Sequence, residues 1–227
     1  MSDHEHPGHD HRYGHGHERD RGLVAMVRYL GHAPEMWWSD VNTAVVDLVS
    51  PQAGEQVLDI GAGMGPGVVA AAARGATVVA VEPTPFMRRV LTVRRLWQRA
   101  RSHIDIRGGA AEKLPADDAS IDAVWAVNTM HHWVDPERGA AEIGRVLRTG
   151  GRVVLVDENF TDPSHPDYEE FGRRHSSDDE NHHHGFTMVD AEQMGDWLRA
   201  AGVADVEASV RTVAGRPSTV VTAGVTG

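Results

Sequence analysis

Three side chains that can take part in proton transfer follow two apolar segments in the second half of the chain. His131 and His132 come shortly after the segment that ends at Asn128, and Asp157 comes directly after residues 152–156. Histidine is the usual base near neutral pH. The carboxyl ends of parallel strands line one crevice of an open α/β sheet, so we expect these three side chains to converge there.

A glycine-rich turn follows an earlier apolar run at 57–60. Gly61, Gly63 and Gly65 allow a sharp turn and let the backbone lie against a ligand without an intervening side chain. A helix is predicted over 68–73, and strand, glycine turn and helix form the first unit of a nucleotide-binding α/β sheet. Pro66 stands where a dinucleotide fingerprint needs a small residue, and no phosphate-binding lysine follows.

A carboxylate ends the next predicted strand. Glu82 follows the β-branched run 76–81, about twenty residues beyond the glycine turn. One carboxylate with two oxygens suits the two adjacent hydroxyl donors of a ribose. We therefore expect Glu82 to bind a nucleoside.

The spacing of Asp59, Gly61, Gly63 and Gly65 resembles motif I of class I S-adenosyl-L-methionine (SAM)-dependent methyltransferases, written Asp-x-Gly-x-Gly-x-Gly. The resemblance implies that these four residues bind SAM. It also implies an α/β fold of the Rossmann-like, doubly wound type, with a seven-stranded sheet that ends in a C-terminal antiparallel hairpin.

A second segment, 108–115, resembles the Gly-Asp-Ala-Glu-x-Leu-Pro stretch that holds adenine in many of these enzymes. Ala110 stands where the family usually has an aspartate, so the side chain at this position cannot accept a hydrogen bond from the adenine amino group. The resemblance implies that the backbone amides of Ala111 and Glu112 hold the ring edge. Asn128, at the end of the fourth predicted strand, is a further candidate for cofactor binding.

The sequence pattern of residues 145–157 resembles the branch of this methyltransferase family that includes quinone C-methyltransferases and natural-product sugar O-methyltransferases. The sugar enzymes use a His-His pair and an acid at these strand ends. This implies that His131 or His132 takes the proton of an acceptor hydroxyl while Asp157 orients the histidine or balances its charge. We expect O-methylation of a polar small molecule, a sugar or glycoside.

Two alternatives stay open. In relatives that methylate the carbon of a quinone-like ring, a His-His pair at this point positions the substrate or packs. The chain could also be a SAM-binding or metal-binding protein without turnover.

A divalent metal ion is a second hypothesis. Nitrogen and oxygen ligands cluster at Asp178, Asp179, Glu180, His182, His183 and His184, and Asp157 and Glu158 could complete a shell. From this set we take Glu158, His182 and His184 as the candidate metal ligands. The alternative interpretation is that these residues belong to an exposed acidic lid that binds no metal ion.

The predicted elements define one domain. Residues 1–22 have the composition of a disordered, histidine-rich tail. The resemblance implies that residues 23–227 form a methyltransferase domain, in which we expect 159–188 to be a lid or acceptor wall. Further helices are expected over 23–30, 35–49, 85–101, 135–147 and 189–201, and further strands over 104–106, 117–128, 152–156, 203–213 and 218–226, with a turn at 149–151.

Composition and net charge limit which partners and which catalytic groups we expect. The chain has 227 residues and a net charge of −11, which argues against a nucleic-acid partner. It has no cysteine, which excludes a cysteine nucleophile. Without a recognisable signal peptide or membrane span, we expect a cytoplasmic protein with no membrane partner. The acid-free arginine block at 88–101 is interpreted as solvated surface.

Overall fold

The computed structural model describes residues 37–169 and 189–224. The predicted tail at 1–22, the predicted helix at 23–30 and the metal candidates His182 and His184 lie outside the described residues.

Strands and helices alternate along most of the described chain. The helices are α3 (Asp40–Val49), α4 (Pro66–Ala73), α5 (Pro85–Leu96), α6 (Pro136–Val146) and α8 (Ala191–Ala200), with short 3₁₀ turns η2 (Arg101–His103) and η3 (Met130–His132). The strands are β1 (Gln56–Ile60), β2 (Thr77–Val81), β3 (Ile104–Arg107), β4 (Ile121–Val127), β5 (Leu147–Glu158), β6 (Val206–Val213) and β7 (Arg216–Ala223).

The strands form one seven-stranded sheet in the order β3-β2-β1-β4-β5-β7-β6. The first five strands pair in parallel, whereas β7 is antiparallel to both β5 and β6. The predicted sheet with its final hairpin is therefore confirmed. Since the strand order reverses between β1 and β4, the crevice for a ligand lies at the carboxyl ends of these two strands.

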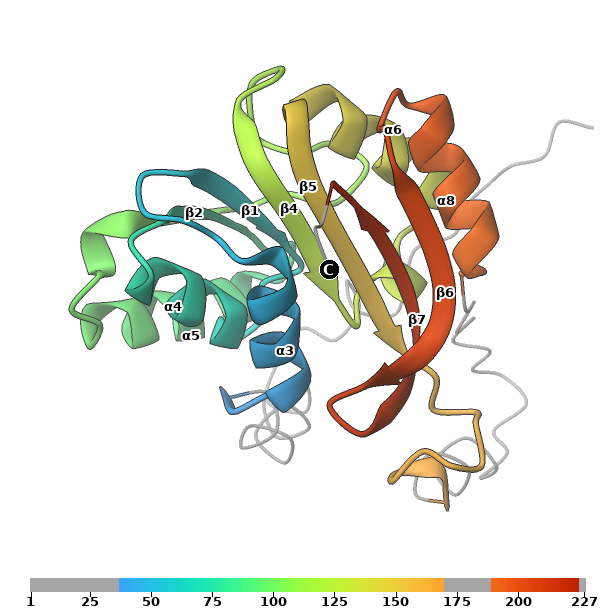
Figure 1. Cartoon of the computed structure of the whole chain (residues 1–227). Coiled ribbons are helices and arrows are strands. Elements are labelled where there is room, and N and C mark those ends of the chain that lie inside the picture. The colour runs from blue at the N-terminus through green and yellow to red at the C-terminus, as the bar shows by residue number, and fades with distance from the viewer. Residues whose placement is uncertain (1–36, 170–188, 225–227) are drawn as a thin grey trace, which may run out of the picture.

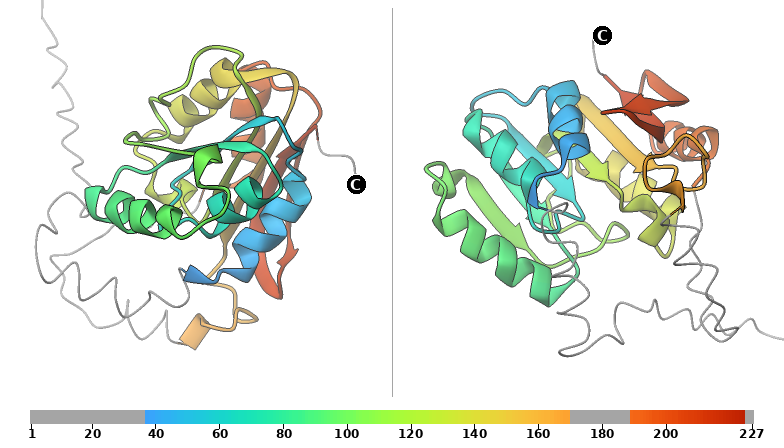
Figure 2. Two further views of the ribbon diagram at one scale, coloured as in Figure 1. Left: turned by 90° about the vertical axis from the view of Figure 1, so that its left-hand side faces the viewer. Right: turned by 90° about the horizontal axis from the view of Figure 1, so that it is seen from below.

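Helices cover both faces of the sheet (Figure 1). Helices α3, α4 and α5 lie on one face and α6 and α8 on the other, as the rotated views also show (Figure 2). Alternate residues of each strand enter the two cores: in β5, Val153 and Leu155 pack on the α6 and α8 side, and Val154 and Val156 on the other. Burial on both sides explains why the parallel strands read as continuous apolar runs.

Several boundaries differ from the sequence predictions, and three of the differences have a clear structural basis. Helix α3 begins at Asp40 rather than within 35–39, because the Ser39 side chain accepts a hydrogen bond from the amide of Asn42 and caps the helix there. Helix α5 ends at Leu96 and not at residue 101. The predicted turn at 149–151 lies inside β5, where it forms an irregularity: Leu147 pairs with Ile121 but Arg152 pairs with Ala123.

Candidate active site

The glycine turn between β1 and α4 lies at the carboxyl ends of the central strands. Gly61, Gly63 and Gly65 have φ angles of 72°, 53° and 80°, which ordinary residues rarely adopt. A Cβ atom at Gly61 would collide with Thr129, and one at Gly65 would collide with Leu91. The predicted motif therefore forms a turn whose surface is backbone, as the binding of an adenosyl-type ligand requires.

Glu82 lies at the end of β2 and contacts this turn. One carboxylate oxygen accepts a 2.9 Å hydrogen bond from the amide of Gly63, and the other accepts a 2.8 Å bond from the amide of Thr84. Each oxygen has a further lone pair. The side chain therefore fixes the turn and has acceptor capacity that fits two ribose hydroxyls.

Asp59 is buried below the turn, with only 2% of its surface exposed. Its side chain faces Gly67 in α4, where Asn42 and Trp125 also present polar atoms. Burial raises the pKa of the Asp59 carboxyl well above its ordinary value near 3.8; the neighbouring Trp125 indole opposes this and Glu82 adds to it. The Asp59 Oδ2 and Trp125 Nε1 atoms do not reach hydrogen-bond geometry.

The segment that resembles the adenine-binding stretch forms a turn against α6. Ala111 is buried, and the Glu112 carboxylate accepts hydrogen bonds from the amides of Val134 and Asp135 at 2.6 and 3.2 Å. The Glu112 side chain is therefore directed at the start of α6. Only its backbone amide and that of Ala111 are candidates for contact with a cofactor.

Asp157 and His131 form a buried pair at the ends of β5 and η3. The His131 Nδ1 atom lies 2.9 Å from Asp157 Oδ2, and the two side chains are 5% and 1% exposed. The same carboxylate accepts hydrogen bonds from the backbone amides of Thr129, Met130 and His131 at 2.9, 3.3 and 3.0 Å. Four donors thus hold Asp157, and Asp157 in turn holds the orientation of the imidazole ring.

His132 differs from its neighbour in position. It is exposed, and its ring centroid lies 3.9 Å from that of His131 at a tilt of 56°. The predicted triad is therefore brought together, but Asp157 contacts His131 directly and reaches His132 only through that ring.

The side chains of Asn128 and Glu158 are directed towards each other. The Asn128 amide donates a 2.6 Å bond to Glu158 Oε1 and accepts a 2.8 Å bond from the Glu158 backbone. Glu158 Oε2 also lies 3.0 Å from His165 Nε2 and 2.9 Å from Arg216 Nε. Because Asn128 and Glu158 already have these partners, both link β4 and β5 to the chain that follows.

Metal binding by the described residues has no geometric support: none of their His, Asp and Glu side chains cluster in groups of three or more that could hold an ion. Helices that could cross a bilayer are likewise missing from the part of the chain that the structure describes.

Arg94 contacts the glycine turn, which the sequence interpretation missed, and its assignment to a solvated surface is wrong. It is 7% exposed, donates a 3.0 Å hydrogen bond to the carbonyl of Met64 in the glycine turn, and stacks 4.3 Å from the Trp37 ring. The sequence feature that could have predicted the burial of Arg94 is its spacing in α5, which places it on the same helical face as the buried Met87 and Leu91. His165 was missed for a different reason, because its partner Glu158 is defined only by the tertiary structure.

An open sheet with a glycine turn, a strand-end carboxylate and a crevice between β1 and β4 defines a nucleotide-binding α/β protein. Comparison with known proteins specifies the family. Residues 58–155 match the family model described as a methyltransferase domain. A demethylmenaquinone methyltransferase from Clavibacter sepedonicus is 33% identical over 182 residues, which cover 73% of this chain and 72% of that protein.

Other similar proteins are also described as methyltransferases. An uncharacterised methyltransferase of Mycobacterium tuberculosis is 43% identical over 111 residues, or 49% of this chain, and the match spans only 43% of the length of that relative. Among solved structures, a candidate methyltransferase from an antibiotic biosynthesis pathway of Anabaena variabilis has a TM-score of 0.59 at 25% identity, covering 75% of this chain and 64% of that one. The chain belongs to the class I SAM-dependent methyltransferase family, and the cofactor of that family is SAM.

Proposed function

We propose that this protein transfers the methyl group of SAM to a hydroxyl of a polar small molecule, a sugar or glycoside, with His131 as the base. The observation that supports this proposal most strongly is the buried contact between His131 Nδ1 and Asp157 Oδ2 at 2.9 Å. The contact lies two residues from Thr129, which itself packs against Gly61 of the glycine turn. The base is therefore close to the turn that we assign to the methyl donor.

SAM supplies an electrophilic methyl group when it is bound. The chain must then align the acceptor and take its proton. Asp157 keeps the proton of the neutral ring on Nδ1, so that Nε2 is the basic atom. Nε2 would take the hydroxyl proton as the oxygen–methyl bond forms and the methyl–sulfur bond of SAM breaks to leave S-adenosylhomocysteine, and Asp157 would stabilise the resulting imidazolium. General base catalysis of this kind contributes about 10²–10⁴-fold to the rate.

For cofactor binding, we assign the backbone at Gly61, Gly63 and Gly65 to contacts with the amino-acid and adenosyl parts of SAM. Glu82 takes the ribose, and the amides of Ala111 and Glu112 take the adenine edge. Asp59 acts from below by supporting the turn. The role predicted for Asn128 is the weakest of these assignments, because its side chain is bonded to Glu158.

We also propose that residues 23–227 form one methyltransferase domain and that 159–188 provides the acceptor wall. A divalent ion at Glu158, His182 and His184 is a separate proposal. Glu158 has His165 and Arg216 as partners, so an ion there must displace at least one of them. Turnover that survives exhaustive chelation would contradict the metal proposal.

A second candidate function is C-methylation of a quinone-like ring. The similarity to the Clavibacter demethylmenaquinone methyltransferase over 73% of the chain favours it. In this case His131 and His132 would position the ring, and loss of a histidine would change substrate affinity more than the pH dependence of turnover.

The test is to incubate the full chain with SAM and a fractionated metabolite extract, and to identify by mass spectrometry the compounds that gain a methyl group. With that acceptor, His131→Gln should lower kcat by about 10²-fold or more while leaving SAM affinity within about twofold. His132→Gln is the matched control, because His132 is exposed and does not contact Asp157 directly. Unchanged turnover in both variants would show that neither histidine is the base.

A further inference from the structure

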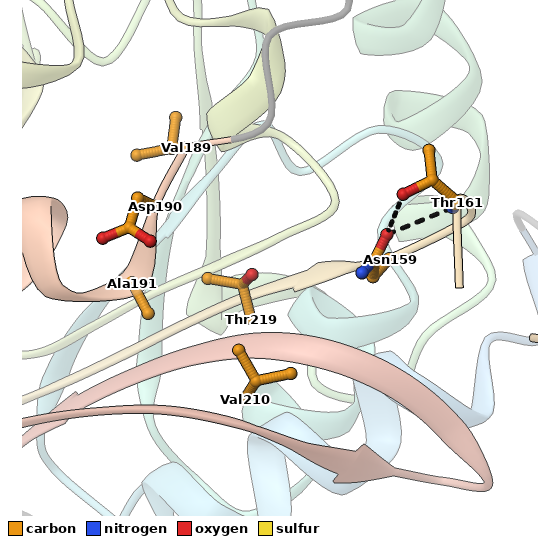
Figure 3. Close-up of a pocket in the computed structure, with 7 residues that line it drawn as sticks. All are labelled: Asn159, Thr161, Val189, Asp190, Ala191, Val210 and Thr219. Atoms are coloured by element: carbon orange, nitrogen blue, oxygen red, sulfur yellow. Dashed lines mark hydrogen bonds between the residues drawn. The ribbon is translucent and has the colours of Figure 1, made fainter. Parts of the chain in front are cut away.

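A small cavity opens on the α6 and α8 side of the sheet, at the edge formed by β5, β7 and β6. It has a volume of about 240 Å³ and is lined by Asn159, Thr161, Val189, Asp190, Ala191, Val210 and Thr219 (Figure 3). The site described above uses none of these residues.

Strand register places this cavity next to the His131–Asp157 pair. Thr219 pairs with Asp157 across β5 and β7, and Val210 pairs with Thr219 across β7 and β6. Directly paired residues project on the same face of a sheet, with Cβ atoms about 4.5–5.5 Å apart. Asp157, Thr219 and Val210 therefore form one row, which begins at the carboxylate that holds the proposed base His131 and ends in the cavity.

Thr219 is the polar residue that indicates a ligand. It is only 7% exposed, yet its hydroxyl makes no hydrogen bond to any residue that the structure describes. Its oxygen is not among the buried side-chain atoms that lack a partner, so it is open to the cavity and not enclosed by protein. Because Thr219 lines the cavity, a bound molecule can supply that partner.

The remaining polar groups of the cavity provide both donors and acceptors. Asn159 Oδ1 accepts from the Thr161 amide and hydroxyl at 3.1 and 2.6 Å, which leaves its amide nitrogen as the donor. The Asp190 carboxylate accepts a 3.0 Å bond from Gln193 at the start of α8, and its other oxygen is a further acceptor. Figure 3 shows these groups on opposite sides of Thr219.

The lining also excludes some ligands. The described residues that line it include no arginine, lysine or histidine, so they offer no cation for a phosphate or carboxylate. Nor do the seven described lining residues include an aromatic ring on which a quinone could stack. Its apolar members, Val189, Ala191 and Val210, are small aliphatic side chains that suit the carbon–hydrogen face of a saturated ring. The volume is below the roughly 300–1,000 Å³ of drug-sized pockets, which limits the occupant to about one ring.

We propose that this cavity is the subsite that holds a neutral, hydroxyl-bearing saturated ring of the acceptor, such as a monosaccharide unit, with Thr219, Asp190 and Asn159 bonded to its hydroxyls. The inference rests on the proposed function, since it extends the acceptor site from His131 across the sheet. It assigns Thr219 and Asp190 as specificity-determining residues.

The test measures binding and does not require turnover. Methyl α-D-glucopyranoside is titrated into the ¹⁵N-labelled full chain in the presence of S-adenosylhomocysteine, and amide chemical shifts are followed. We expect saturable shifts at Asn159, Ala191 and Thr219. Thr219→Val and Asp190→Asn should each weaken binding about five- to tenfold, because each removes one hydrogen-bonding group while keeping the shape of the side chain. Val210→Trp should abolish binding by filling the cavity.

Two controls keep the result specific. Thr222→Val removes a hydroxyl from the same strand at similar burial, 9% exposed, but on the opposite face, so it should leave binding unchanged. Asn at position 190 retains the capping function for α8, so a loss of binding is not a loss of the helix. Glucose 6-phosphate and 1,4-dihydroxynaphthalene should bind more weakly than the glucoside.

The subsite is overturned if the glucoside gives no saturable shifts at these amides, if Thr219→Val binds it as tightly as Thr222→Val does, or if the naphthalene diol binds there more tightly. The two proposals have different readouts: turnover of His131→Gln tests the base, and glucoside binding by Thr219→Val tests the subsite. Loss of turnover in His131→Gln and loss of glucoside binding in Thr219→Val are therefore separate outcomes, and either proposal can fail without the other.

Discussion

Two acid–histidine pairs meet at the end of β5. Asp157 holds His131 on the α6 and α8 side, whereas Glu158 holds His165 on the opposite side, because consecutive residues of a strand point to opposite faces. Glu158 is also paired with Arg216, which balances its charge within the fold. This difference in surroundings fits the proposed chemical role of the first pair, whereas the second pair is bound within the fold.

At the same scale, the buried Asp59 carboxyl makes stability depend on pH. Its pKa is raised in the folded state, mainly by burial. The native state therefore keeps the proton after the unfolded chain has lost it. The resulting stabilisation is fully present below the ordinary pKa near 3.8 and is lost as the pH rises through the raised pKa of the folded state.

We predict that Asp59→Asn flattens this dependence. Between about pH 4 and pH 7 the unfolding free energy of the variant should fall less than that of the wild type, and at pH 7 the variant should be the more stable protein. Urea unfolding at several pH values measures this, with the exposed Asp40→Asn as control. Equal slopes for Asp59→Asn and the wild type would show that this carboxyl does not titrate abnormally.

At the scale of elements, helices α6 and α8 pack closely at a glycine. A Cβ atom at Gly144 would lie 2.5 Å from the carbonyl oxygen of Ala201 and 2.8 Å from its Cβ. Backbone cannot move aside as a flexible side chain can, so the contact requires glycine. Since α8 also carries Ala191 of the proposed subsite, this contact positions the acceptor side of the molecule.

Gly144→Ala should therefore lower the unfolding free energy by about 1–3 kcal/mol. Gly195→Ala is the matched control within α8, because its nearest neighbour would be 3.4 Å away. There the gain in helix propensity should stabilise the protein by about 0.5–1 kcal/mol. Chemical denaturation of both variants measures the difference, and equal effects would contradict the packing argument.

Across the whole molecule, the sheet joins groups that are far apart in sequence into one site. Glu82 at the end of β2 binds Gly63 after β1, and Arg94 of α5 binds Met64 in the same turn. These contacts hold the turn before any ligand arrives. A ligand that binds the folded state alone must then stabilise the whole domain.

We predict that S-adenosylhomocysteine at 100 times its Kd raises stability by about 2.7 kcal/mol, which corresponds to roughly 5–10 °C in Tm. Glu82→Gln should remove most of this shift, because it loses an acceptor for the Gly63 amide and for the ribose. Glu112→Gln should keep it, since the Glu112 carboxylate serves α6. Differential scanning fluorimetry compares the three proteins, and a full shift in Glu82→Gln would exclude the ribose assignment.

The amino-acid sequence was sufficient for the features that depend on local rules. Apolar runs at 57–60 and 152–156 become buried strands, positive φ angles fall on Gly61, Gly63 and Gly65, and His131, His132 and Asp157 meet because parallel strands end at one edge. Each of these follows from a few consecutive residues or from the topology of the fold class.

Only the tertiary structure decided which side chains are partners. It turned Glu158 and Asn128 towards each other, buried Arg94 beneath the glycine turn, and placed Thr219 beside Asp157 with its hydroxyl in a cavity. These contacts join residues from 30 to 62 positions apart, and their geometry depends on strand register and helix docking. No local pattern encodes that information, because register and docking are set by the packing of the entire core.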